Sequence, residues 1–145
     1  MIKRIIARMA RFRDMRRFAE VVKNHNDNER NDPDMVAFAG DDDWLLKINR
    51  EEAQKQYQDK YNVSSITSQE VYEDVVSKPF GYVNVESTPI SEKCLWVGSK
   101  GRNLLKKGGL FKEYAKHNKD FLHLLLAFIG GLVGGVGVVV AILSL

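Results

Sequence analysis

The sequence predicts a small α+β domain, with a basic amphipathic helix before it and one transmembrane helix after it. Three observations predict this class. Residues 121–145 contain no Asp, Glu, Lys, Arg, Asn, Gln or Pro, and an apolar run longer than about 18 residues is typical of a membrane-spanning helix. Residues 1–23 repeat apolar side chains at helical spacing, whereas residues 82–97 alternate with the period of β-strands.

The N-terminal segment, residues 1–23, is predicted to be a basic amphipathic helix. Residues 1–25 carry eight Lys or Arg against only Asp14 and Glu20. Such a helix either lies on anionic lipid or packs against the domain or a partner. An organelle-import presequence is a third alternative, which the two acidic residues disfavour. The arginines that we assign to membrane-surface or partner binding are Arg4, Arg8, Arg11, Arg13, Arg16 and Arg17.

The next stretch is predicted to be a linker followed by a turn. Residues 24–34 are polar and include Pro33, which predicts a linker. Short apolar runs at 35–39 and 44–48 flank Gly40 and three aspartates, which predicts a hairpin turn. These carboxylates lack the alternate-ligand spacing of a calcium loop, so no metal site is expected.

Two capping signals predict consecutive helices in the middle of the chain. Asn49 and Glu52 form an N-capping pair, which predicts a helix that continues to about Tyr61. A second signal at Thr67 begins another helix, which Pro79 stops.

Beyond these helices the pattern changes to that of a β-hairpin. Alternation within residues 82–97 predicts two antiparallel strands. Ser99 can cap a short helix that ends at Gly108. The following helix is predicted to continue through a juxtamembrane segment, residues 113–120, into the apolar run.

The order helix, helix, hairpin, helix is that of a winged-helix domain. With GSKGRNLLKKGG at residues 98–109, the chain resembles small bacterial winged-helix proteins over residues 45–112, and we assign residues 35–112 to such a domain. The resemblance implies that the helix at 68–78 occupies the position that reads the DNA major groove. Its charged residues are Glu70, Glu73, Asp74 and Lys78. A net negative helix has the wrong sign for phosphates, so DNA binding is not carried over.

Four further cations follow the hairpin: Lys100, Arg102, Lys106 and Lys107. They could contact a nucleic acid backbone, but beside a bilayer they more simply face anionic headgroups. We therefore assign Lys106 and Lys107 to membrane-surface or partner binding.

The apolar run is predicted to carry a helix–helix interface. Overlapping Gly-x-x-x-Gly pairs begin at Gly130 and Gly131 and allow close helix approach. The residues assigned to this interface are Ala127, Gly130, Gly131, Gly134, Gly135, Gly137 and Ala141. Basic residues precede the run and none follows it, so the positive-inside rule places the domain in the cytosol, or on the matrix side of an organelle.

No catalytic signature is present in the sequence. It lacks a phosphate-binding loop, a His pair at ligand spacing and a Ser or Cys with a nearby base, so we expect no enzyme activity, cofactor or small-molecule substrate. Nucleic acid is not expected as a partner. The sequence predicts a tail-anchored, single-pass membrane protein that contacts lipids, forms homo-oligomers through its glycine-rich span and acts as an interaction or scaffold module. The alternatives are an accessory subunit of a heteromeric membrane complex, for example in an energy-converting organelle, and a small pore-forming effector.

Overall fold

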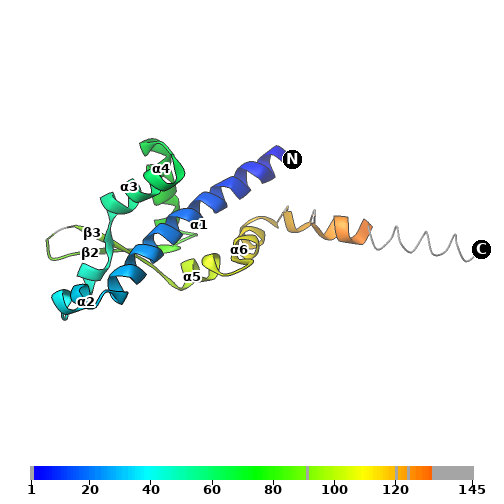
Figure 1. Cartoon of the computed structure of the whole chain (residues 1–145). Helices are drawn as coiled ribbons and strands as arrows, with labels where there is room; N and C mark the ends of the chain where they lie inside the picture. Colours follow the sequence, from blue (N-terminus) through cyan, green and yellow to red (C-terminus); the bar gives the residue numbers. More distant parts are fainter. Residues whose placement is uncertain (1, 91, 120, 124, 132–145) are drawn as a thin grey trace, which may run out of the picture. The chain divides into compact units, whose positions relative to one another are not determined.

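The computed structural model describes residues 2–90, 92–119, 121–123 and 125–131. Its contacts divide the chain into two units, Met1–Leu110 and Phe111–Leu145. The first unit contains a three-stranded sheet and the helices labelled in Figure 1 up to α5. Helix α1 (Ile2–Asn31) is the element on which the rest of this unit packs, because it contacts the sheet and every other helix of the unit.

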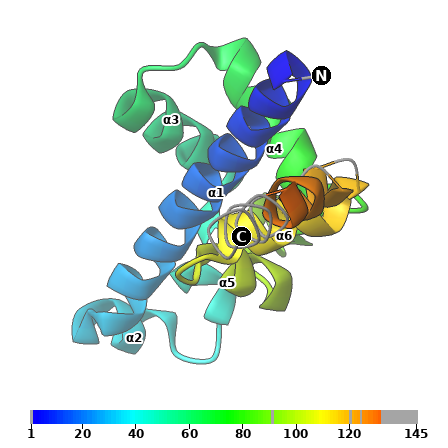
Figure 2. The same ribbon diagram turned by 90° about the vertical axis from the view of Figure 1, so that its right-hand side faces the viewer.

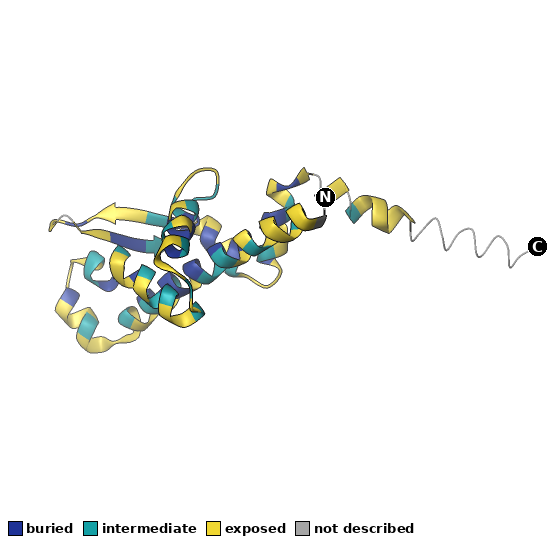
Figure 3. Ribbon diagram, turned by 90° about the horizontal axis from the view of Figure 1, so that it is seen from above, coloured by how far each residue is buried: buried dark blue, intermediate teal, exposed yellow. Residues whose placement is uncertain are grey.

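Helix α1 is longer than predicted. The polar residues 24–31, expected to belong to a linker, continue the helix to Asn31. An ion pair between Lys23 and Asp27 lies at the i,i+4 spacing that supports a helix. The middle of α1 is buried in the domain, as Figure 3 shows, whereas the residues before Phe12 are mostly exposed. The core residues of this helix are Phe12, Met15, Phe18, Ala19, Val21 and Val22.

The hairpin turn predicted around Gly40 is absent from this described part of the chain. Instead, residues Pro33–Ala39 form helix α2 and residues Asp43–Leu46 form the 3-10 helix η1. The Asp32 side chain accepts hydrogen bonds from the backbone N–H groups of Asp34 and Met35, and proline occupies the first helical position. These are strong helix-start signals, and they outweigh the apolar runs that suggested strands.

The two central helices are present. Helix α3 (Arg50–Tyr61) begins where predicted, with the Asn49 side chain accepting a hydrogen bond from the Glu52 N–H at 2.8 Å. Helix α4 (Ser65–Val76) begins earlier than predicted. Its cap is Ser64, whose Oγ accepts a hydrogen bond from the backbone N–H of Thr67.

The sheet contains the predicted hairpin and a third, short strand at the end of the apolar run 44–48. Strands β2 (Val83–Ser87) and β3 (Lys93–Val97) form the expected antiparallel hairpin. A two-residue strand, β1 (Ile48–Asn49), pairs antiparallel with the other edge of β3, which gives the order β1-β3-β2. The predicted strand at 44–48 is therefore wrong in extent and in partner, because its first residues belong to η1 and Ile48 pairs with β3 rather than with residues 35–39.

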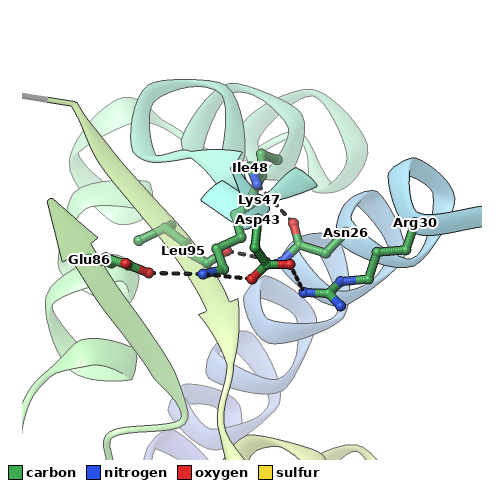
Figure 4. Close-up of polar contacts among 7 residues, drawn as sticks. All are labelled: Asn26, Arg30, Asp43, Lys47, Ile48, Glu86 and Leu95. Atoms are coloured by element: carbon green, nitrogen blue, oxygen red, sulfur yellow. Dashed lines mark hydrogen bonds and ion pairs between the residues drawn. The ribbon is translucent and has the colours of Figure 1, made fainter. Parts of the chain in front are cut away.

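A buried asparagine joins α1 to the sheet (Figure 4). The Asn26 amide donates to the carbonyl oxygen of Leu95 at 2.9 Å, and its oxygen accepts the N–H of Ile48 at 2.8 Å. Ile48 and Leu95 are opposite each other in the β1–β3 pair. One side chain therefore satisfies a donor on β1 and an acceptor on β3.

Four charged residues continue this contact at the surface (Figure 4). Asp43 of η1 accepts from Arg30 of α1 at 2.8 Å and lies 3.1 Å from Lys47. Lys47 also donates to Glu86 of β2 at 2.9 Å. The chain of ion pairs connects α1, η1 and β2.

The last helix of the first unit lies apart from α3 and α4. Figures 1 and 2 show α5 (Ser99–Leu105) on the opposite side of α1 from α3. In the view of Figure 1, α4 also lies across α1 from α5. Helix α6 (Gly109–His117) leads into the second unit, where the Tyr114 and Phe121 rings meet edge to face with centroids 4.9 Å apart.

The prediction of a transmembrane helix is wrong. No helix in the described part of the chain is both long and apolar enough to cross a membrane. A helix that crosses a membrane needs about 20 consecutive, mainly apolar residues, and no described helix meets this requirement. Residues 124 and 132–145 lie outside the described residues. The correction extends to the tail-anchored localisation and to the three membrane functions, and it leaves a small mixed α/β domain.

The predicted helix–helix interface is only partly described. At Gly130 and Gly131, an added Cβ would meet no atom within 4 Å, and Ala127 is exposed. The remaining predicted interface residues, which lie outside the described residues, are Gly134, Gly135, Gly137 and Ala141.

Candidate anion-binding surface

Three of the predicted binding arginines are engaged within the domain. Arg11 forms a two-point ion pair with Asp74 of α4, and this hydrogen bonding raises the pKa of Arg11 above its ordinary value. Arg13 and Arg17 both pair with Asp14, at 3.5 and 3.4 Å. These guanidinium groups already have carboxylate partners, so they are poor candidates for capturing another anion.

Arg16 differs from these neighbours. Its Nη2 donates to the carbonyl oxygen of Leu105 at 3.5 Å, and it forms no ion pair with a described residue. Leu105 is the last residue of α5, and the exposed Lys106 and Lys107 follow it directly. A cation from α1 therefore joins two cations at the C-terminal end of α5, where the helix dipole favours positive charge.

Helix α5 itself adds two exposed cations. The Lys100 ammonium group donates to the Pro79 carbonyl at 3.4 Å, and Arg102 donates to the Val97 carbonyl at 3.5 Å. Neither forms an ion pair within the described chain. We define the cationic surface as Arg16, Lys100, Arg102, Lys106 and Lys107. Between Glu92 and Glu113 the sequence contains no Asp or Glu, so no carboxylate neutralises this surface from within α5.

A close approach of two backbones holds α5 in place. A Cβ at Gly101 would lie 2.1 Å from the Tyr82 carbonyl oxygen and 2.6 Å from Cγ1 of Val97. Only glycine allows α5 to lie so near the sheet. Leu104, on the same helix, is fully buried. The cationic side chains therefore project from a helix whose apolar face belongs to the core.

The helix that the winged-helix resemblance implied as the DNA reader does not belong to the cationic surface. Asp74 of α4 is occupied by Arg11, and Glu70 and Glu73 line an acidic groove between α4 and α1. In the view of Figure 1, helices α4 and α5 lie on opposite sides of α1. Positive and negative surfaces are thus separated within one small domain.

The other reactive side chains offer little chemistry. No group of three or more His, Cys, Asp or Glu in the described residues is arranged to hold a metal ion. Cys94 is buried, and burial raises the pKa of its thiol, which disfavours the nucleophilic thiolate. His25 lies 4.0 Å from a carboxylate oxygen of Glu29, four residues on in α1, and 4.0 Å from one of Glu52 on α3. Only the second contact joins two helices, and no local pattern indicated it.

The sequence analysis assigned three residues of the cationic surface to binding, Arg16, Lys106 and Lys107, and left Lys100 and Arg102 unassigned. Arg4 is exposed, as predicted, and Arg8 lies in the same exposed first turns of α1. The ion pair that neutralises Arg11 depends on Asp74, which is 63 residues away in the chain. Likewise, Arg16 meets α5 across 89 residues.

Comparisons with protein-family models, with curated protein sequences and with solved structures find no match for this chain.

Proposed function

We propose that this protein binds the phosphate backbone of nucleic acid, without sequence specificity, through the cationic surface. This proposal reverses the expectation from the sequence, which rested on the net negative charge of the helix at 68–78 and on an adjacent membrane. One observation carries the proposal. The five cations around α5 form no ion pair with any described carboxylate, whereas Arg11, Arg13 and Arg17 on α1 are paired. Unneutralised like charges repel one another, and a linear polyanion relieves that repulsion while releasing its own counterions.

The geometry favours nucleic acid over an anionic lipid surface. A helix that binds lipid inserts an apolar face beneath its basic residues. The apolar face of α5 is already buried in the domain, through Gly101 and Leu104. In addition, no large hydrophobic residue between positions 93 and 110, all of which are described, is exposed.

Salt-dependent binding tests the proposal. Fluorescence anisotropy with a labelled DNA duplex of about 20 base pairs should give a plot of log affinity against log salt with a slope of about −4 to −5, because five phosphate contacts each contribute about −0.9. Affinity should then fall roughly 500-fold between 50 and 200 mM salt. A duplex of unrelated sequence should bind equally well.

The decisive variant removes three lysines of the cationic surface. Lys100→Gln/Lys106→Gln/Lys107→Gln should reduce the magnitude of the slope by about 3. The matched control, Lys55→Gln/Lys78→Gln/Lys93→Gln, removes the same charge from other exposed positions and should change it little. Equal effects of the two triple variants would contradict a defined surface. Binding to phosphatidylserine vesicles without binding to DNA would replace nucleic acid with a lipid partner.

A further inference from the structure

A groove runs between the N-terminal half of α1 and α4, on the side of α1 away from the cationic surface. Its volume is about 450 Å³. The lining residues that the argument uses are Ala7 and Ala10 on α1, and Glu70, Val71, Glu73 and Asp74 on α4. The two alanines present no side chain beyond Cβ, so another backbone can approach α1 closely at this point.

Two large apolar side chains that are mostly exposed flank this groove. Ile6 precedes Ala10 by four residues on α1 and is 61% exposed, and Ile66 precedes Glu70 by four residues on α4 and is 72% exposed. Residues four apart share a helix face. Covering an isoleucine side chain contributes about 1.5–3 kcal/mol, so the flanks offer a partner two sites for hydrophobic contact.

The groove is acidic in net charge. Four carboxylates line it, those of Asp14, Glu70, Glu73 and Asp74, against the single cation Arg11. Asp14 and Asp74 pair with arginines of α1. Glu70 and Glu73 form no ion pair with any described residue. A partner that places cations beside these two carboxylates would therefore be favoured.

The first turns of α1 have the complementary character. Before Asp14 this helix contains only basic charged residues, and Lys3, Arg4, Ile6 and Met9 are all exposed. The same surface of one copy thus carries both an acidic, small-residue groove and a basic helix with exposed apolar groups. Self-complementarity of this kind is what a two-fold symmetric interface requires.

We propose that a second copy of this chain occupies the groove, with the N-terminal turns of α1 from each copy lying against α1 and α4 of the other. Ala7 and Ala10 then lie near the two-fold axis, where the two helices cross. Ile6 is covered, and Lys3 and Arg4 face Glu70 and Glu73 of the other copy. This contact lies away from α5 and is independent of nucleic acid binding.

A reciprocal charge exchange tests the arrangement in the whole chain, without nucleic acid. The unaltered protein should sediment as a reversible dimer of twice 16.5 kDa. Glu70→Lys/Glu73→Lys alone, and Lys3→Glu/Arg4→Glu alone, should each raise the dimer dissociation constant at least tenfold, because like charges meet. Mixing the two variants should restore the dimer, since both contacts of the mixed pair then join opposite charges.

Cross-linking supplies a second measurement at the proposed axis. Under oxidation, Ala10→Cys should form a disulfide-linked dimer, whereas the chain with only the buried Cys94, and Asn28→Cys on an exposed part of the same helix, should not. A monomeric unaltered protein, a mixture that stays monomeric, or equal cross-linking at positions 10 and 28 would each overturn the proposal.

Discussion

Replacement of Asn26 tests how α1 is joined to the sheet. Asn26→Ala removes the two hydrogen bonds to Leu95 and Ile48, at 2.9 and 2.8 Å, from a position that is 7% exposed. Each buried backbone group left without a partner costs about 1–3 kcal/mol. The better helix propensity of alanine recovers only about 0.6 kcal/mol. Allowing for water that enters the vacated space, we expect a loss of about 2–4 kcal/mol in the free energy of unfolding.

Urea unfolding of the whole chain, followed by far-ultraviolet circular dichroism, measures this loss. With a slope of about 1.5 kcal/mol per molar urea, the midpoint should fall by about 1–3 M. Asn28→Ala makes the same chemical change at an exposed position of the same helix and should be neutral or slightly stabilising. If the two substitutions cost the same, the Asn26 bridge contributes nothing beyond helix propensity, and the reasoning is refuted.

Two further predictions concern the core. Gly101→Ala should destabilise the domain by about 1–2 kcal/mol, although alanine favours a helix, because the new Cβ would lie 2.1 Å from the Tyr82 carbonyl oxygen. Thermal unfolding measures this loss. The control is Gly130→Ala, whose Cβ would meet no atom within 4 Å and which should not destabilise the domain. Burial, with a further contribution from Asp14, raises the pKa of Tyr57 to about 12. The unfolded chain releases this proton near pH 10, so about 2–3 kcal/mol of stability should be lost between pH 10 and 12. Tyr57→Phe should abolish this loss and cost nothing at pH 7, since the described chain offers the buried hydroxyl no hydrogen-bond partner; unchanged pH dependence in this variant would contradict the assignment.

Local signals predicted the parts of the fold that local chemistry controls. The capping asparagine before α3 and the alternating pattern of the hairpin act within a few residues, and both elements lie where the sequence placed them. Asp32, which caps α2, is an equally local signal. The prediction of strands at this point was wrong because it relied on the neighbouring apolar runs instead.

Other features depend on contacts that no local pattern records. Residues 24–31 are as polar as a linker, yet they stay helical because Asn26 is held between two strands. Strand β1 forms because its backbone pairs with the edge of β3 that β2 leaves open. The transmembrane helix was predicted from the composition of the apolar run alone, and no described helix is both long and apolar enough to be one.

By itself, the sequence determined where the charges lie and which segments favour helix or strand, since both follow from residue type and spacing. Only the tertiary structure decided which charges are neutralised. It placed Asp74 against Arg11, and it left Arg16 beside α5 without a carboxylate among the described residues. The pairs of Asp14 with Arg13 and Arg17, in contrast, are local contacts within α1. The physical reason is that an ion pair requires two side chains within about 4 Å, and the packing of α1 between α4 and α5 sets that distance.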